Sequence, residues 1–281
     1  MKKWLLLMVL ILTIVSCGRQ ASKDTETKEE AVQVNEDDYV LVEGGTFNMG
    51  YTFGDEEEDK KPTHNVTLDS FYMSKYEVTQ KEYTELMDYN PSKFSGDNLP
   101  VEQITWYNAV MYANKLSEKR KLKPYYNISS ITKDGNAIIN AQVTIVGGKG
   151  YRLPTESEWE YAAKGGKLSK NYMYSGSNNV DEVAWYASNS NKKTQMVGEK
   201  KANELGIYDM SGNVWEWCWN GNGPYRSSYK TNTTEDYGSA IRVSRGGGWG
   251  VDESFLPVTF IYYSRSDNYG SLKGFRLVRS Y

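Results

Sequence analysis

The chain has 281 residues, and its 33 lysines and arginines against 36 aspartates and glutamates give a net charge of −3 at neutral pH. Such a balance offers no basic excess to nucleic acids or anionic membranes, so we expect no nucleic-acid partner. The sequence holds only two cysteines and one histidine, which restricts the thiol and metal chemistry that it can support.

The first residues have the pattern of a secretion signal. Two lysines precede an apolar run over residues 4–15, which is too short to cross a bilayer as a stable helix but is typical of a signal peptide. The run ends in Ile14-Val15-Ser16-Cys17, which resembles the lipobox of bacterial lipoproteins. This resemblance implies that Cys17 is the lipidated first residue of the mature chain and attaches it to a membrane. The alternative is a truncated transmembrane anchor in which the cysteine is incidental.

Residues 17–38 predict a flexible tether. Beyond the cysteine this segment is charged and nearly free of large apolar side chains, so it cannot bury enough surface to order itself. We therefore expect a signal peptide over 1–16, this tether, and one domain over 39–281. Gly18 stands where an aspartate would favour retention on an inner membrane, so we expect the protein on the outer membrane and the cell surface.

Glycine turns and alternating apolar residues predict several short strands. Residues 39–50 indicate a strand, a turn at Gly44-Gly45 and a second strand. Apolar residues alternate over 65–72, which indicates a third strand. Asp134-Gly135 between two polar, strand-like segments predicts a hairpin.

Three helices are predicted from their start signals. Residues 79–82 (TQKE) form a capping box, in which a threonine and a glutamate three positions later satisfy each other's backbone N–H groups. Thr105 precedes apolar residues at helical spacing and so predicts the start of the second helix. Residues 155–158 (TESE) form a second capping box, and this third helix is expected to end at Gly165-Gly166.

Eight phrases, kept in order, resemble the formylglycine-generating enzyme (sulfatase-modifying factor) family. They are residues 42–47 (VEGGTF), 76–79 (YEVT), 100–101 (PV), 151–162 (YRLPTESEWEYA), 203–210 (NELGIYDM), 211–217 (SGNVWEW), 245–249 (RGGGW) and 274–276 (GFR). Together they extend from about Tyr39 to the C-terminus. The resemblance implies an α+β fold of the large C-type-lectin type, irregular, with short helices around small twisted sheets.

The same resemblance argues against catalysis. The family's oxidase uses two cysteines a few residues apart, and the matching positions fall near Val251 and Leu256, with no cysteine anywhere after Cys218. The iron-dependent sulfoxide synthases that share this domain need a histidine cluster, which His64 alone cannot supply. We therefore expect no catalytic residues and no redox cofactor, and we expect His64 to be a hydrogen-bonded loop residue.

The C-terminal stretch resembles the variable proteins of diversity-generating retroelements, in which template adenines are randomised at the 3′ end of the gene. Residues 242–249 and 274–279 match the fixed pieces, and the resemblance implies that 250–273 is a diversified binding segment. The segment has neither helical nor strand periodicity, which is typical of exposed loops. Its ligand would be an unknown macromolecule, either a protein or a glycan.

Twelve residues of this segment are predicted to vary, because each is reachable from an asparagine codon by adenine changes. They are Gly250, Val251, Asp252, Ser254, Phe255, Phe260, Tyr262, Tyr263, Arg265, Tyr269, Gly270 and Ser271. The fixed framework would include Trp249, Glu253, residues 256–259, and Lys273 to Arg276. Tyrosines in such a segment offer a large contact area with few rotatable bonds. The alternative, that two or three of these aromatics are ordinary core residues, stays open.

The tryptophan-rich phrase 213–219 predicts a buried strand, because its three indoles stand at alternate positions. Family members bind calcium near this phrase, and oxygen-only ligands suit a hard cation. The resemblance implies a structural calcium ion held by the Asp209 carboxylate, the Gly212 and Val214 carbonyls and the Glu216 carboxylate. The alternative is that the two carboxylates cap turns or pair with Arg152 or Arg276.

Three functions follow from these observations. The first is a monomeric, surface-displayed, ligand-binding lipoprotein with a diversified face. The second is a scaffold or chaperone-like lipoprotein of the cell envelope. The third is a formylglycine-generating oxidase, against which the missing cysteines argue.

Overall fold

The computed structural model describes residues 38–50, 63–221 and 240–281. The predicted signal peptide, Cys17 and the tether up to residue 37 lie outside these ranges. All described residues belong to one unit, Gln33–Tyr281. Within them, no helix is long and apolar enough to cross a membrane.

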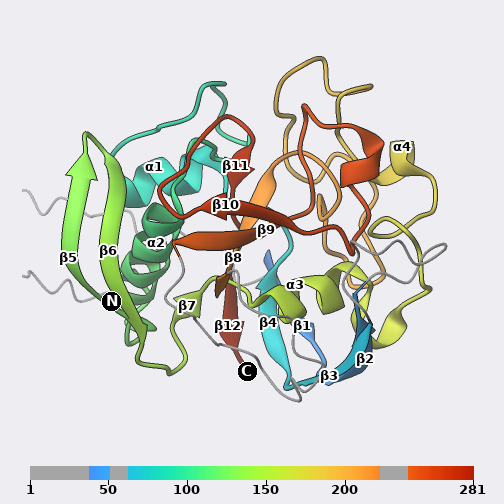
Figure 1. Ribbon diagram of the computed structural model, residues 1–281, viewed down its shortest axis with the longest axis horizontal. Helices are drawn as coiled ribbons and strands as arrows, with labels where there is room; N and C mark the ends of the chain where they lie inside the picture. Colours follow the sequence, from blue (N-terminus) through green and yellow to red (C-terminus); the bar gives the residue numbers. More distant parts are fainter. Residues whose placement is uncertain (1–37, 51–62, 222–239) are drawn as a thin grey trace, which may run out of the picture. The chain divides into compact units, whose positions relative to one another are not determined.

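One four-stranded sheet joins the two ends of the domain. Its order is β1 (Tyr39–Val42), β4 (Phe71–Ser74), β12 (Val278–Ser280) and β7 (Tyr151–Arg152), with antiparallel neighbours. The first and last strands of the domain therefore flank the same central strand, at the bottom of the view in Figure 1.

A second four-stranded sheet carries the C-terminal part of the chain. Its order is β10 (Tyr262–Arg265), β9 (Ile241–Arg245), β8 (Trp215–Gly221) and β11 (Lys273–Gly274). β8 pairs antiparallel with β9 and parallel with β11, and β10 is an edge strand. Two further hairpin-like pairs complete the strands, β2 (Gly45–Met49) with β3 (His64–Leu68) and β5 (Tyr126–Asp134) with β6 (Ala137–Ile145).

The three predicted helices are present with their predicted starts. Thr79 and Glu82 form the capping box of α1 (Gln80–Met87), and the Thr105 side chain caps α2 (Trp106–Lys119) by accepting from the backbone N–H of Asn108. Thr155 and Glu158 form the capping box of α3 (Glu156–Ala163). The remaining helical turns are η2 (Gly166–Leu168), α4 (Val180–Val183) and η3 (Glu253–Phe255). The predicted hairpin turn lies between β5 and β6.

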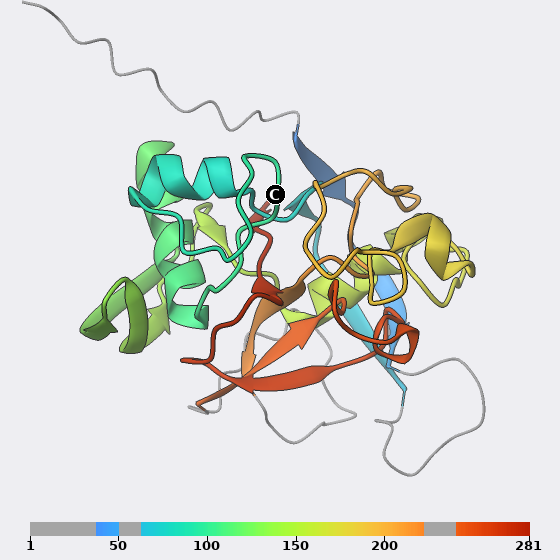
Figure 2. The same cartoon turned by 90° about the horizontal axis from the view of Figure 1, so that it is seen from above.

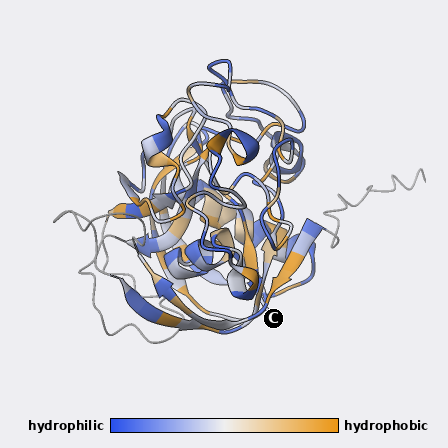
Figure 3. Ribbon diagram, turned by 90° about the vertical axis from the view of Figure 1, so that its right-hand side faces the viewer, coloured by the Kyte–Doolittle hydropathy of each residue, from blue (hydrophilic) through white to orange (hydrophobic). Residues whose placement is uncertain are grey.

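The core lies between the two four-stranded sheets and α3. The side chains of Trp106, Trp159 and Trp217 are buried completely, and so are those of two arginines, Arg245 and Arg276. Colouring by hydropathy shows apolar residues along the inner strands and polar residues in many of the surrounding loops (Figure 3). Strand β8 is buried on both faces rather than on one, because Glu216 and Cys218 between its indoles are also fully buried.

The two strands predicted over 39–50 are present as residues 39–42 and 45–49. They pair with β4 and β3, because the chain changes sheets at Gly44. A Cβ at Gly44 would lie 2.4 Å from the carbonyl oxygen of Leu68, so this crossing needs glycine. The expectation that His64 lies in a loop was wrong, because His64 is buried in β3 opposite Met49.

Candidate binding face

Segment 250–273 lies on the side of the domain away from β1. In Figure 2 the red ribbon of this segment runs along the lower side of the domain, while β1 and the C-terminus lie toward the upper side. The segment is more regular than its sequence predicts, since it contains η3 and the edge strand β10. The four residues of β10 give no alternating apolar signal, because Tyr262 is exposed and Ser264 is buried.

None of the twelve residues predicted to vary is buried. Seven are exposed, namely Gly250, Asp252, Ser254, Phe255, Tyr262, Arg265 and Tyr269, and five are half-buried, namely Val251, Phe260, Tyr263, Gly270 and Ser271. Within the same segment Leu256, Val258, Thr259 and Lys273 are buried. Side chains that reach the core therefore alternate with side chains that reach solvent.

The aromatic side chains of the segment touch one another across its turns. The rings of Phe255 and Phe260 lie 5.1 Å apart. Trp215 of β8 lies beneath them, 6.0 Å from Phe260 and 5.0 Å from Tyr262, which stacks on it. A framework indole therefore joins three of the predicted variable positions into one continuous patch. Tyr263 differs, because its ring packs against the main core, and burial raises the pKa of its hydroxyl.

A buried lysine lies under this patch. The Lys273 ammonium lies 4.5 Å from the ring centroids of both Trp217 and Tyr262, and donates a hydrogen bond of 3.2 Å to the Ser244 hydroxyl. Burial lowers the pKa of Lys273 to about 7. Burial therefore disfavours the charged form of Lys273, which lies beneath the exposed Tyr262.

Framework side chains hold the segment by its main-chain carbonyls. The Arg245 guanidinium donates to the carbonyl of Phe260 at 2.6 Å, and the Trp249 indole donates to that of Ser271 at 2.6 Å. The Ser211 hydroxyl donates to the carbonyl of Leu256 at 3.0 Å. Arg245 is itself fixed, fully buried and paired with the Glu160 carboxylate.

Backbone N–H groups of the framework make further contacts of the same kind. Gln103 donates to the carbonyl of Gly270 at 3.1 Å, Trp106 to that of Ser266 at 3.0 Å, and Ala187 to that of Val251 at 3.0 Å. A carbonyl oxygen is present whatever side chain its residue carries. These contacts therefore fix the path of the segment without fixing its sequence.

The residues implied as calcium ligands lie close together, but Glu216 is already paired. The Arg276 guanidinium donates to both of its oxygens, at 2.6 and 2.7 Å, and the Trp159 indole donates to one of them at 2.6 Å. All three side chains are fully buried. The pairing with Arg276, one of the two alternatives from the sequence, is thus what the structure contains.

Asp209 and Glu77 complete this buried cluster. Asp209 accepts from the backbone of Gly198 with one oxygen, while its other oxygen has no partner among the described residues, and burial raises its pKa to about 6. Burial also raises the pKa of Glu77, which accepts from the Asn213 amide and from the backbone N–H of Val214.

These residues as they lie do not fit a calcium ion at Glu216, because Arg276 and Trp159 take both of its oxygens. Gly212 has a φ of +95°, and its backbone N–H donates to the carbonyl of Gly246. Within the described ranges, no group of three or more histidine, cysteine, aspartate or glutamate side chains is arranged to hold a metal. Calcium at these four residues stays an untested prediction from the sequence, and the pairing of Glu216 with Arg276 argues against it.

The resemblance places the oxidase's cysteines near Val251 and Leu256, and neither of these residues carries a thiol. Val251 is half-buried and Leu256 is buried, and both pack in a small cluster with Tyr174 and Tyr186. Cys218 is buried in β8, where burial raises the pKa of its thiol well above the ordinary value. A buried thiol with a raised pKa is a poor nucleophile.

Comparison with known proteins identifies the family. Residues 23–281 match the model of the sulfatase-modifying factor enzyme 1-like domain. The chain belongs to this family. Its fold is accordingly the C-type-lectin-like α+β fold that the sequence predicts, with short helices and small sheets.

Several known proteins resemble the chain. It is 42% identical to the chaperone protein LppX of Paenibacillus barcinonensis over the whole of both chains. It superposes on Treponema denticola variable protein 1 with a TM-score of 0.76 and 30% identity, covering 86% of this chain and 95% of that one. It is 26% identical to the formylglycine-generating enzyme of Streptomyces coelicolor, over 77% of this chain and 80% of that protein. The first two names are not those of enzymes.

Proposed function

We propose that the chain is a membrane-anchored, non-catalytic binding lipoprotein whose segment 250–273 is a diversified face for a macromolecular ligand. The observation that carries the proposal is the way this segment is held. Arg245, Trp249 and the backbone of Gln103 bind its carbonyl oxygens, so these contacts do not depend on the twelve side chains predicted to vary. A face that must change its sequence and keep its shape needs this kind of support.

The chemistry of the exposed side chains suits binding. Phe255, Tyr262 and Tyr269 are 38%, 40% and 47% exposed, and Arg265 reaches solvent beside them. Aromatic residues and arginine dominate the energetics of binding surfaces, and aromatic rings bury a large area with little loss of side-chain entropy. The likeness to Treponema denticola variable protein 1 supports the same interpretation.

A scaffold or chaperone-like role in the cell envelope is the second candidate, favoured by the identity with LppX along the whole chain. The two candidates differ in their genetics. A diversified segment requires a near-identical, asparagine-codon-rich copy of the last stretch of the gene beside a reverse transcriptase gene. Sequencing the locus in independent isolates tests this requirement. Changes confined to the twelve codons support the diversified face, and an invariant segment without a template copy supports the scaffold.

The non-catalytic part of the proposal has its own test. Incubated with a cysteine-containing sulfatase peptide, copper and oxygen, the protein is expected to leave the peptide's cysteine unconverted, because no thiol stands near Val251 or Leu256. Mass spectrometry measures the conversion, with the Streptomyces coelicolor enzyme as the positive control. Formation of formylglycine would contradict the assignment.

A further inference from the structure

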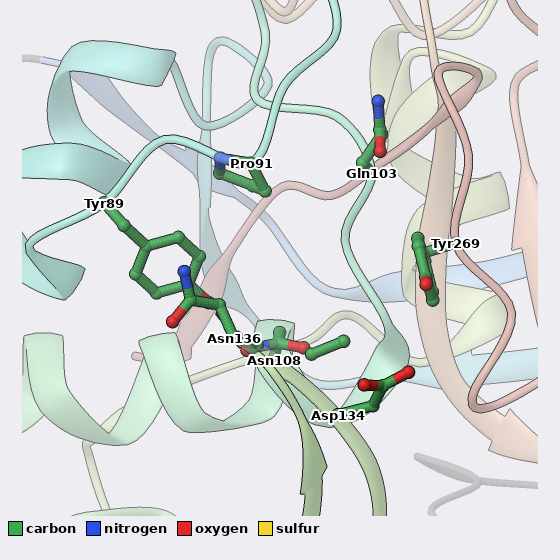
Figure 4. A pocket seen from close by; sticks show the side chains of 8 residues that line it. Tyr89, Pro91, Gln103, Asn108, Asp134, Asn136 and Tyr269 are labelled. Carbon is green, nitrogen blue, oxygen red and sulfur yellow. Dashed lines mark hydrogen bonds between the residues drawn. The ribbon is translucent and has the colours of Figure 1, made fainter.

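A cavity of about 230 Å³ lies beside the binding face, where a segment before α2, the loop after α1 and the tip of the β5–β6 hairpin meet (Figure 4). Tyr269 of segment 250–273 forms one wall. Tyr89 lies across the cavity from it, and Asn108 lies on the floor between them. One wall thus belongs to the segment that is proposed to vary, and the rest belongs to the framework.

The floor of the cavity is rigid. Asn108 is buried, and its amide nitrogen donates to the Tyr89 hydroxyl at 3.0 Å and to the carbonyl of Asn136 at 3.1 Å. Its amide oxygen accepts from Thr105 and from the backbone of Ile138. Every hydrogen-bonding group of this asparagine is therefore used in holding three chain segments together. A floor fixed in this way costs a ligand little reorganisation.

Around this floor, polar side chains remain available. Among the described residues, no protein group hydrogen-bonds to the side chains of Gln103, Asp134, Asn136 or Tyr269, although all four line the cavity. Two of these side chains are amides, which donate and accept, one is a hydroxyl, and one is a carboxylate. A ligand that meets them must itself both donate and accept.

The lining excludes two other kinds of ligand. None of the described residues that line the cavity is a lysine or arginine, which an anionic ligand would need as partners. Among the described lining residues Asp134 is the only one with a carboxylate, and it is exposed, so it would hold a cation through one solvated charge, an arrangement worth little. The remaining combination, tyrosine rings beside amides and hydroxyls, matches a ring that carries hydroxyls at its edge and C–H groups on its faces.

We propose that this cavity binds one neutral sugar residue of a glycan, with tyrosine rings against its C–H face and side-chain amides on its hydroxyls. The inference deepens the proposed function, since it names a ligand class for one end of the binding face. The backbone N–H of Gln103 donates to the carbonyl of Gly270, next to Tyr269, so the wall is held in place by its main chain. Residue 269 would then select among sugars that the fixed amides bind.

Saturation-transfer NMR on the full-length protein, in a detergent without a sugar headgroup, tests the proposal. The probes are the methyl glycosides of glucose, galactose, mannose and N-acetylglucosamine, each titrated to about 50 mM. A single sugar residue in a small cavity is expected to bind with a dissociation constant of about 1–10 mM, so at least one probe should saturate. N-acetyl-lysine amide, at the same concentrations, serves as the cationic probe.

Three tyrosine variants give the test its specificity. Tyr269→Ala should weaken binding at least tenfold and Tyr269→Phe should keep most of it, because the ring makes the contact. Tyr281→Ala is the control, an exposed tyrosine outside segment 250–273 and outside the cavity, and should bind like the wild type. Both alanine variants should remain folded, which circular dichroism checks.

Three results would overturn the proposal. They are the absence of saturable binding by all four glycosides, equal losses in the two alanine variants, and binding of the lysine probe instead. None of these results bears on whether a template copy lies beside the gene, so the proposed diversified face and the sugar cavity fail separately.

Discussion

Replacing Arg276 with methionine should show whether the domain's centre is held by an ion pair. Arg276 donates to both oxygens of Glu216, and also to the carbonyls of Ser74 and Tyr208 at 3.2 and 2.8 Å. It therefore connects β4, the 203–210 loop and β8. In Arg276→Met, Glu216 stays fully buried with only the Trp159 indole as partner. Leaving one member of a buried pair without its counter-charge costs about 3–5 kcal/mol of unfolding free energy.

Urea denaturation followed by tryptophan fluorescence measures this loss. With a slope of about 3 kcal/mol per molar, the midpoint should fall by about 1–2 M. Arg279→Met is the matched control, since Arg279 is half-buried and lies 4.6 Å from the centroid of the Tyr72 ring, a contact worth about 1 kcal/mol or less. The double variant Glu216→Gln/Arg276→Met should lose less than the sum of the single variants, because no unpaired charge remains. An Arg276→Met loss no larger than the control's would refute this reasoning.

Three further predictions concern the metal, the buried lysine and the anchor. Chelation with EDTA should leave the melting temperature unchanged, because Glu216 is paired with Arg276; a fall that Asp209→Ala abolishes would instead support the calcium site. Burial lowers the pKa of Lys273 to about 7, so between pH 7 and the ordinary value of 10.5 the unfolded chain binds a proton that the folded chain does not. Stability relative to Lys273→Met should therefore rise with pH across that window, by up to about 1.4 kcal/mol per pH unit, and stay constant below pH 6; a flat difference in urea titrations would disprove it. Cys17→Ala should leave the detergent-extracted membrane fraction or fail to mature, whereas unchanged partitioning would argue against lipidation.

The sequence predicted what local chemistry determines. The capping boxes at Thr79 and Thr155 satisfy backbone groups within three residues, so their helices begin where expected. The hairpin turn at Asp134-Gly135 is equally local. Strand β10 was missed because it is an edge strand of four residues, whose exposed Tyr262 stacks on Trp215 of another strand. Its stability comes from that sheet and not from its own pattern.

Long-range pairings could not be predicted from residue types alone. Asp209 and Glu216 each had two open interpretations. The residues around a buried carboxylate in the sequence do not show whether its partner is a metal ion or an arginine, and the arginine that pairs with Glu216 is 60 residues away. The sugar cavity draws its lining from four separated segments. The framework's hydrogen bonds to segment 250–273 are accepted by main-chain carbonyl oxygens. Every residue has such an oxygen, so these bonds cannot be predicted from the amino-acid sequence.

Hydrogen exchange in a multiply substituted variant tests the central claim most directly. The five exposed side chains of Ser254, Phe255, Tyr262, Arg265 and Tyr269 are replaced together with alanine in the full-length protein. Because the framework binds main-chain carbonyls, unfolding free energy should fall by no more than about 3 kcal/mol. The amides of Gln103, Trp106 and Trp215, which donate to the segment, should keep their protection after correction for that change. Exchange of these three amides at the rate of a free loop would contradict the account, because it would mean that the side chains, and not the main chain, hold the face.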